Sequence, residues 1–320
     1  MSSFGGVTTR LRGRDELLTW AATPSYLEAF AGSDIGACVV GEWARDSIPQ
    51  GRSALVTAGD PADVFYTAFC ESVKSGEWSR VPRSRGARTV IAPTAVIHDD
   101  VSVGDDCVIM DHVVVLPQTY IGDRVVIKPN TTLGGDGMQL GRVRGRRQPI
   151  PHAGGVVIGS DVTIGSGCCV DRGLFGEMSA IGDDTHLDNL VHVAHSTEIG
   201  RGTTIAACSE ISGSSTIGDG VWLAPQCAIT DSVCVGDHAW LGIGSVVTRD
   251  VPAHAVALGV PARVIGWRCV CETRLTPEDS GPSRCPSCGR AFDFESGQAV
   301  LIGVIDLHES GAEHRAGNRE

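Results

Sequence analysis

The sequence predicts an all-β solenoid, a parallel β-helix, with a small α/β domain before it and a four-cysteine segment after it. Three observations predict this architecture: an aliphatic residue recurs every six positions through the middle of the chain, the first 88 residues lack that period, and two closely spaced cysteine pairs follow it. With 320 residues and 42% hydrophobic content, the chain is long enough for two or three domains and a sizeable core.

Residues 1–88 predict a small α/β domain. ELLTWAATPSYLEAF predicts a strand, a turn and the start of a helix, and IGACVV and ALVTAG predict two further strands. DPADVFYTAFCESV predicts a helix that begins at an Asp–Pro signal. Composition alone does not indicate what this domain binds.

The repeat predicts a parallel β-helix over residues 89–266. Aliphatic residues are spaced six apart from Ile91 to Leu133, and the register returns from Ile158 to Val170 and from Ile181 to Val247. Neither a helix nor an ordinary amphipathic strand has a period of six. Three hexapeptides make one coil of about 18 residues, and the aliphatic side chains stack as an interior column.

Two interruptions break the register. Residues 134–157 form an insertion rich in Gly, Arg and Pro. Residues 171–180 contain a smaller insertion, with five residues more than the six-residue period requires. Insertions in a solenoid map to loops on one face, which is often the binding face. Functional residues are therefore expected beside these two segments.

The segment 267–307 contains four cysteines with the spacing of a structural zinc site: Cys269, Cys271, Cys285 and Cys288. Two closely spaced thiolate pairs suit a tetrahedral zinc ion of the zinc-ribbon kind, which stabilises a short domain and leaves no ligand position for catalysis. Unrelated free thiols are the alternative. Residues 308–320 are expected to form a flexible polar tail.

Charge and composition exclude several classes of protein. The formal net charge of −12 disfavours binding to nucleic acid. No stretch of about 18 apolar residues predicts a transmembrane helix, and the opening residues lack the apolar run of a secretory signal. A cytoplasmic protein is expected, in which cysteines are reduced thiols or metal ligands.

One polar cluster lies directly beyond the second interruption. LDNLVHVAHSTEIG contains Asp188, Asn189, His192 and His195. An imidazole titrates at about pH 6.5, which suits proton transfer at neutral pH. From the residues alone, a catalytic and a structural role both stay open. Gly213 lies 18 residues beyond His195, one full coil, so the two are expected to stack on one face.

Four segments carry a family resemblance, in this order: GGDG at Gly134–Gly137, PIPHAGGVVIG, VDRG at Val170–Gly173, and LDNLVHVAHSTEIG. Together they resemble the UDP-3-O-acylglucosamine N-acyltransferases of lipid A synthesis, within the hexapeptide-repeat acyltransferases. TWAATPSYLEAFAGSDIGACVV is similar to that family's uridine-binding domain, so the resemblance covers roughly residues 15–250. It implies a left-handed β-helix and a homotrimer, and the apolar flanks of a thin prism make self-association reasonable.

The resemblance implies an acyltransferase that moves an acyl group from a thioester, on acyl carrier protein or CoA, to the amine of a UDP-linked amino sugar. It implies a ternary complex without a covalent intermediate and no cofactor for catalysis. The family's general base falls on His195, and its backbone N–H donor to the tetrahedral oxyanion falls on Gly213.

The resemblance also implies the binding residues. The uracil positions are Trp20, Tyr26 and Thr23, where two aromatic rings preserve stacking and a hydroxyl replaces the family's amide. A second family histidine position is occupied by Ser232. The positions near the sugar and the base are Asp136, Asp171, Asp188, Asn189 and His192. A carboxylate at position 188 would orient the imidazole and raise its basicity.

Two features concern the acyl donor. GIGSVVTRDVPAHAVALGVPARVIG resembles the end of hexapeptide acetyltransferases that use acetyl-CoA, and the cysteine-bearing segment resembles that of some nucleotide-sugar acetyltransferases. Four arginines in the first insertion either meet phosphates of a nucleotide, CoA or phosphopantetheine, or form a solvated loop: Arg142, Arg144, Arg146 and Arg147.

Three alternatives follow from the same residues. An acetyl-CoA-dependent N-acetyltransferase of another nucleotide amino sugar, in polysaccharide or antibiotic sugar synthesis, would share the catalytic residues. A non-catalytic solenoid scaffold would leave the cluster around His195 without a purpose. A hydro-lyase of the carbonic anhydrase type would need two histidines on stacked coils, and no histidine pair differs by 18 or 36 positions.

Overall fold

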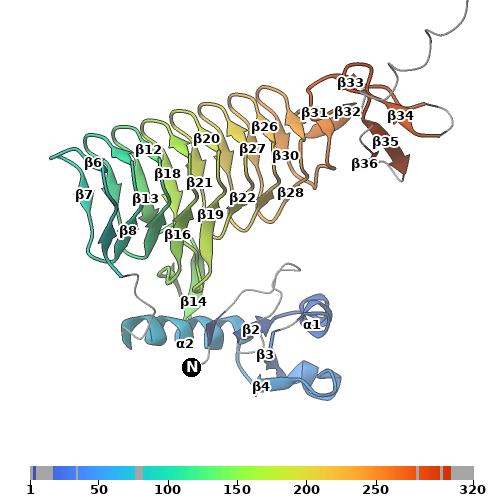
Figure 1. The fold of residues 1–320 in the computed structure, drawn as a ribbon. Helices are drawn as coiled ribbons and strands as arrows, with labels where there is room; N and C mark the ends of the chain where they lie inside the picture. Colours follow the sequence, from blue (N-terminus) through green and yellow to red (C-terminus); the bar gives the residue numbers. More distant parts are fainter. Residues whose placement is uncertain are drawn as a thin grey trace, which may run out of the picture.

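The computed structural model describes residues 3–4, 17–33, 35–75, 82–278, 281–295 and 298–303. These residues form an N-terminal layer of sheet and helices, a long prism of stacked coils and a small β module at the end of the prism (Figure 1). The tail expected over residues 308–320 lies outside the described residues. No described helix is long and apolar enough to cross a bilayer.

The N-terminal part is an α/β unit, as predicted. Its four parallel strands lie in chain order: β1 (Ser3–Phe4), β2 (Leu17–Ala21), β3 (Ala37–Gly41) and β4 (Ser53–Thr57). Its helices are α1 (Pro24–Ala31), the 3₁₀ helix η1 (Glu42–Ser47) and α2 (Pro61–Ser75). Both α-helices begin at a proline, whose missing N–H is tolerated in the first turn. Helix α1 buries Leu27 and Phe30, three positions apart on one face.

The prism is a left-handed parallel β-helix with three sheets. Sheet I contains β7 (Val96–Ile97), β10 (Val114–Val115), β13 (Thr132–Gly135), β18 (Cys169–Asp171), β21 (His192–Val193), β24 (Glu210–Ile211), β27 (Ala228–Ile229) and β30 (Val246–Val247). Sheet II contains β5 (Ser84–Arg85), β8 (Val101–Val103), β11 (Thr119–Ile121), β16 (Gly155–Ile158), β19 (Met178–Ile181), β22 (Glu198–Ile199), β25 (Thr216–Ile217) and β28 (Cys234–Val235).

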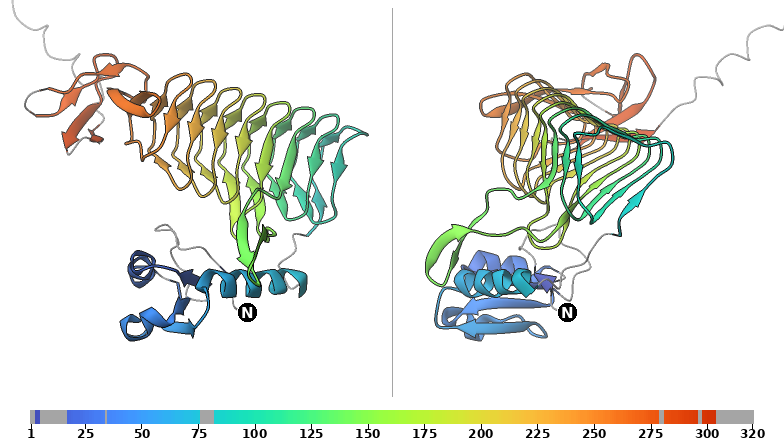
Figure 2. Two further views of the ribbon diagram at one scale, coloured as in Figure 1. Left: turned by 180° about the vertical axis from the view of Figure 1, so that it is seen from behind. Right: turned by 90° about the vertical axis from the view of Figure 1, so that its left-hand side faces the viewer.

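Sheet III completes the prism and extends beyond it. It contains β6 (Val90–Ile91), β9 (Val108–Ile109), β12 (Val126–Ile127), β17 (Thr163–Ile164), β20 (His186–Leu187), β23 (Thr204–Ile205), β26 (Trp222–Leu223), β29 (Trp240–Leu241), β31 (Ala255–Gly259), β32 (Ala262–Arg268) and β33 (Arg274–Leu275). Viewed near its axis, the prism shows its coils stacked on one another (Figure 2).

The interior column has the residues that the period predicts. Leu133, Val170, Val193 and Ile211 are register partners on successive strands of sheet I, and all four are buried. Burial of each such aliphatic side chain contributes about 1.5–3 kcal/mol. Val193 and Ile211 are 18 positions apart, whereas Leu133 and Val170 are 37 apart and Val170 and Val193 are 23 apart. The two insertions therefore add 19 and 5 residues to their coils.

The first insertion forms a hairpin that extends from the prism toward the N-terminal unit (Figure 2). Its strands are β14 (Leu140–Val143) and β15 (Arg146–Pro149), paired antiparallel. The hairpin packs against α2. At the other end, the small module contains the antiparallel strands β34 (Ser283–Arg284), β35 (Ala291–Glu295) and β36 (Gln298–Gly303).

Candidate functional site

One corner of the prism collects both insertions and the two predicted catalytic residues. This I–II corner is made of the connections from sheet I to sheet II: residues 116–118, 136–154, 172–177, 194–197, 212–215 and 230–233. Stacked backbone hydrogen bonds hold successive connections together, since the Ser214 N–H donates to the His195 carbonyl and the Ser232 N–H to the Gly213 carbonyl. The I–II corner is therefore a rigid frame for side chains.

His195 lies between two glycines at this corner. A methyl group on Gly213 would lie 2.6 Å from Cε1 and 2.8 Å from Nε2 of His195. A methyl group on Gly137, from the first insertion, would lie 3.3 Å from Cδ2 of the same ring. The predicted stacking of Gly213 on His195 is thus observed. Among the described residues, no hydrogen bond uses the Gly213 N–H.

The surroundings of His195 keep its imidazole neutral at pH 7. Burial lowers its pKa below the ordinary 6.5, and the negative charges of Glu177, Asp171 and Asp231 oppose that effect. Its Nδ1 lies 3.4 Å from Ser196 Oγ. A half-buried neutral imidazole has the protonation state that a general base needs.

A hydrogen-bonded pair of a histidine and an aspartate lies on the outer face of sheet I. His192 Nε2 lies 3.1 Å from Asp171 Oδ2, and this hydrogen bond raises the pKa of His192. Both residues line a cavity of about 420 Å³, together with Asp136, Gly137, Met138, Gly167, Cys169, Leu190 and Val191. Three of the predicted substrate residues, Asp136, Asp171 and His192, therefore share one cavity beside His195.

His152 is a site residue that the sequence analysis missed. Its ring centroid lies 5.3 Å from that of His195, and it is 4% exposed. Its Nδ1 lies 3.2 Å from the Ile150 carbonyl, and its Nε2 has no hydrogen-bond partner among the described residues. Burial lowers its pKa, so it too is neutral. Its position inside PIPHAGGVVIG, one of the four resemblance segments, is the sequence signal by which it could have been found.

Asp188 and Asn189 do not lie at the I–II corner. They follow β20 and lie where sheet III turns into sheet I, with Asn189 Oδ1 accepting a hydrogen bond from the Ser166 N–H. Asp188 Oδ1 accepts from the Asn189 N–H. The expectation that a carboxylate at position 188 orients His195 is therefore wrong within one chain. The carboxylate beside that imidazole is that of Glu177, in the loop of the second insertion.

Of the three predicted uracil residues, Thr23 and Tyr26 lie at the start of α1 and Trp20 lies in β2, and they differ in accessibility. Tyr26 is 51% exposed and Thr23 is exposed, with its hydroxyl 2.9 Å from that of Ser25. Trp20 is half-buried, with its ring centroid 4.5 Å from that of Phe65 and 6.2 Å from that of Phe175. Trp20 thus contributes to the core between the N-terminal unit and the prism.

The four arginines of the hairpin are exposed, and one of them has a structural partner. Arg144 Nη2 lies 3.0 Å from Glu71 Oε1 on α2, and the Gly145 N–H donates to Asp63. Arg144 therefore joins the hairpin to the N-terminal unit, which is a different role from the predicted contact with donor phosphates. Arg142 and Arg147 are directly opposite register partners. Two like charges at such positions repel each other, which favours an anionic partner.

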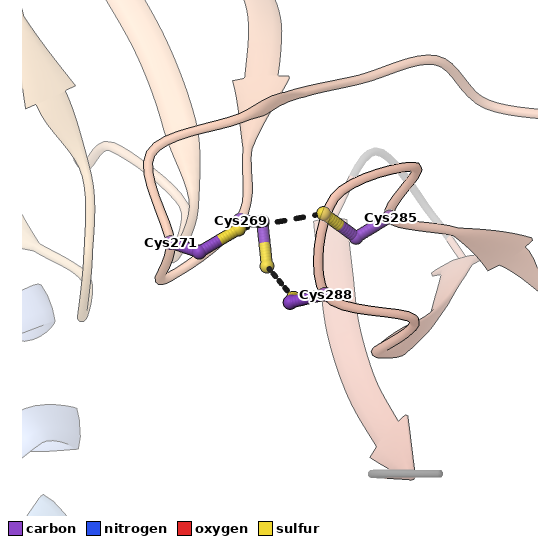
Figure 3. A group of neighbouring side chains, drawn as sticks. All are labelled: Cys269, Cys271, Cys285 and Cys288. Atoms are coloured by element: carbon purple, nitrogen blue, oxygen red, sulfur yellow. Dashed lines mark hydrogen bonds between the residues drawn. The ribbon is translucent and has the colours of Figure 1, made fainter. Parts of the chain in front are cut away.

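The four cysteines converge on one point, as the spacing predicts (Figure 3). Their sulfur atoms all lie within 4.8 Å of one another, with the pairs Cys269–Cys288 and Cys271–Cys285 at 3.5 Å. A tetrahedral zinc ion with bonds of about 2.3 Å holds its sulfurs about 3.8 Å apart, so the arrangement fits. The hydrogen bond between Cys271 and the Thr273 hydroxyl lowers the pKa of Cys271 to about 6, whereas burial raises the pKa of Cys269 to about 12. A zinc ion would displace the protons that remain on the four sulfurs.

Part of the repeat matches a known family model. The profile described as "Bacterial transferase hexapeptide (six repeats)" matches residues 100–135 and 179–213. Among solved structures, the chain is similar to the UDP-N-acetylglucosamine acyltransferase from Campylobacter jejuni, with a TM-score of 0.52 and 23% identity over 59% of this chain and 70% of that chain. The enzyme of the same name from Bacteroides fragilis gives 0.53 and 23%, over 59% and 72%. These likenesses show the fold.

Curated relatives are more similar in sequence. The UDP-3-O-acylglucosamine N-acyltransferase of Maricaulis maris is 53% identical over 132 residues, which are 41% of this chain and 38% of the relative. The protein of the same name from Delftia acidovorans is 36% identical over 214 residues, 61% of each chain. This chain thus matches between about two fifths and three fifths of the length of these relatives. The chain carries bacterial transferase hexapeptide repeats, and it resembles the UDP-3-O-acylglucosamine N-acyltransferases, as its motifs predict.

Proposed function

We propose that this chain is an N-acyltransferase that moves an acyl group from a thioester to the amine of a UDP-linked amino sugar. The observation that carries the proposal is the position of His195, a neutral imidazole held against Gly213 at the corner where both insertions converge. The curated relatives bear the name of an enzyme with this activity. A scaffold would not need a half-buried neutral imidazole beside a lined cavity.

His195 acts as the general base in this proposal. The neutral amine of the sugar attacks the thioester carbonyl carbon, a C–N bond forms, and the electrons of the C=O bond move to oxygen. His195 accepts the proton that the nitrogen must lose. Collapse of the tetrahedral intermediate breaks the C–S bond, and the thiolate leaves and takes up a proton as the free thiol. General base catalysis of this kind contributes about 10²- to 10⁴-fold to the rate.

Gly213 supplies the oxyanion donor in the same proposal. Its N–H lies one coil away from His195 and is not used by a hydrogen bond among the described residues. A backbone donor of this kind is fixed before the reaction, so it stabilises the developing charge without reorganisation. Loss of such a donor costs about 10²- to 10³-fold in kcat.

The acceptor contacts residues from both insertions and from the N-terminal unit. We assign the uridine to exposed Tyr26 and to Thr23, and the sugar to the cavity lined by Asp136, Asp171 and His192. The hairpin joins these two regions, because it packs against α2 and begins next to the cavity. The acceptor would thus span the N-terminal unit and the prism, which the hairpin holds together.

The acyl donor is acyl carrier protein or CoA. The opposed pair Arg142 and Arg147, together with Arg146, offers positive charge to the phosphates that either donor carries. An acetyl-CoA-dependent N-acetyltransferase of another nucleotide amino sugar is the second candidate. The cysteine module at the end of the prism favours it, because a segment of this kind resembles that of some nucleotide-sugar acetyltransferases.

We further propose that the protein is a cytoplasmic homotrimer, as the resemblance implies, and that Cys269, Cys271, Cys285 and Cys288 hold a structural zinc ion. When bound, the zinc ion would cross-link the strand that leaves the prism to the small β module. Four thiolate ligands leave no open position, so the ion would stabilise the module and take no part in the reaction.

The test is acyl transfer by the purified protein with a panel of UDP-amino sugars, each paired with acetyl-CoA, longer acyl-CoA and acyl carrier protein thioesters. Mass spectrometry of the product identifies both the sugar and the acyl group. We expect an amide product that His195→Ala abolishes. Transfer confined to acetyl-CoA would support the second candidate, and no product with any pair would contradict both.

A further inference from the structure

The second insertion places a carboxylate within reach of the residue that follows His195. Glu177 lies at the end of the loop between β18 and β19, and its carboxylate accepts a hydrogen bond from the Ser196 hydroxyl. It also accepts from the Leu174 N–H at 3.0 Å and from the Phe175 N–H at 3.0 Å. Three donors thus fix the carboxylate in one orientation.

The direction of the Ser196 hydroxyl follows from this arrangement. An ionised carboxylate can only accept hydrogen bonds, so the single proton of the Ser196 hydroxyl points to Glu177. The lone pairs of Ser196 Oγ are then left for donors. The Leu174 N–H donates to this oxygen at 3.2 Å, and Nδ1 of His195 lies 3.4 Å from it.

The tautomer of His195 follows from the same logic. A neutral imidazole carries one proton, and Nδ1 must carry it to donate to an oxygen whose own proton is committed elsewhere. The lone pair is then on Nε2, which of the two ring nitrogens lies nearer to the position that a Cβ on Gly213 would take, at 2.8 Å against 3.1 Å for Nδ1. We propose that Glu177 and Ser196 form a relay that fixes His195 as the Nδ1–H tautomer and thereby directs its basic nitrogen toward the reacting amine.

This relay rests on the proposed function and assigns two positioning residues to it. Neither is proposed to touch the substrate, because Glu177 acts through Ser196 and Ser196 acts through Nδ1. The other charged and titratable groups around His195 are Asp171, Asp231, His192 and His152. For none of these does the structure give a hydrogen bond to the His195 ring within the described residues, so the Ser196 hydroxyl is the group that sets its tautomer.

The relay is anchored to the N-terminal unit. The loop that holds Glu177 carries Phe175, whose ring centroid lies 5.4 Å from that of Phe65 and 5.1 Å from that of Phe69, both on α2. Phe175 is 5% exposed. The backbone that donates to Glu177 is therefore held by an aromatic core shared between the prism and the unit assigned to uridine.

Two variants test the relay through different properties. Glu177→Gln removes the charge and retains a side chain of the same size, whereas Ser196→Ala removes the hydroxyl and retains the carboxylate. We expect each to lower kcat by about 10- to 100-fold, the cost of losing a residue that orients a metal-bound histidine. KM for the sugar should change little, since neither residue contacts it. In Glu177→Gln the acid limb of kcat/KM should move to lower pH, because a negative charge near His195 is lost.

Ser214→Ala is the matched control. Ser214 lies one coil away at the I–II corner and has the same left-handed backbone, with φ of 58° against 59° for Ser196. Its side chain has no hydrogen bond among the described residues. We expect wild-type kcat from this variant. Wild-type kcat and an unmoved pH profile in both relay variants would overturn the relay.

A spectroscopic readout separates failure of the relay from failure of the proposed function. The ¹⁵N chemical shifts of His195 distinguish a protonated Nδ1 from a protonated Nε2 at a pH where the ring is neutral. We expect the Nδ1–H form in the wild type and a shift toward the Nε2–H form in Ser196→Ala. A dominant Nε2–H form in the wild type would refute the relay even if acyl transfer is observed. An Nδ1–H form without transfer on any substrate would contradict the function alone.

Discussion

Gly213 packs so closely against the imidazole of His195 that it leaves no room for a side chain, although 18 residues separate the two in the sequence. A side chain at position 213 would overlap three atoms of the ring, at 2.6 to 3.1 Å. The coil length of the β-helix produces this contact, because each coil returns the chain to the same corner one layer further along.

Gly213→Ala should abolish most acyl transfer while the prism stays folded. The added methyl group displaces the imidazole, so the ring leaves the position from which it can accept the amine proton. We expect kcat to fall by at least about 100-fold, as after loss of a general base, with the circular dichroism spectrum unchanged. Gly266→Ala is the control, because a methyl group on Gly266 meets no atom within 4 Å. Normal turnover in Gly213→Ala would contradict the assignment of His195.

The pH profile should identify the base. Burial lowers the pKa of His195 below 6.5, whereas the hydrogen bond to Asp171 raises the pKa of His192 above that value. A base is active when deprotonated, so kcat/KM should fall only as the pH drops below 6.5. An acid limb above 6.5 that disappears in His192→Gln would instead assign the base to His192.

Tyr26→Ala and Trp20→Ala should have different effects, although the resemblance assigns both to uracil. Exposed Tyr26 is free to stack on a base, a contact worth about 1 kcal/mol, so its loss should raise KM for the nucleotide sugar about five-fold with little change in kcat. Trp20 packs on Phe65 and Tyr66 at 4.5 and 5.1 Å, so its loss should lower the free energy of unfolding by about 2–4 kcal/mol. Titration calorimetry and urea unfolding measure the two quantities. Equal unfolding stability in both variants would contradict this division.

The period of six predicts most of the fold, and the coil length alone predicts the contact between Gly213 and His195. The relay carboxylate was not predictable in the same way. Glu177 lies in a loop of extra residues, where no period specifies which side chain turns inward. The partner of Arg144 depends on how the hairpin meets α2, a contact between segments 73 residues apart that composition does not encode. Asp188 was placed by motif position, and only the sheet topology shows that it lies at another corner.

Removal of metal should unfold the cysteine module and spare the prism. The four sulfur atoms lie within 4.8 Å of one another, so a zinc ion bound to all four would cross-link the module, and its binding free energy would contribute to folding of the module. We expect one zinc ion per chain by elemental analysis, and none in the double variant Cys285→Ser and Cys288→Ser. Hydrogen exchange should then rise in β35 and stay unchanged in β21 and β24. The matched variant Cys208→Ser, at an exposed cysteine of the prism, should retain its zinc.

The contact between the cysteine module and the prism should weaken in acid. His254 is 6% exposed, stacks on His238 with ring centroids 5.2 Å apart, and meets the edge of Phe292 from β35 at 5.0 Å. Burial lowers the pKa of both histidines, and the charge of Asp237 opposes this in each. Below pH 6.5, His254 therefore binds a proton more readily when the module is separated from the prism than when the two are packed together. The free energy of packing between module and prism thus becomes less favourable as the pH falls.

Hydrogen exchange in β35 measures this effect directly. We expect faster exchange at pH 5.5 than at pH 7.5, after correction for the intrinsic rate. His254→Phe retains a ring of similar size against Phe292 and cannot be protonated. No hydrogen bond of the His254 ring is found within the described residues, and its buried Nδ1 has no partner there. The difference between the two pH values should therefore shrink in this variant. An equal difference in both proteins would mean that protonation of the stacked histidine pair does not control the contact.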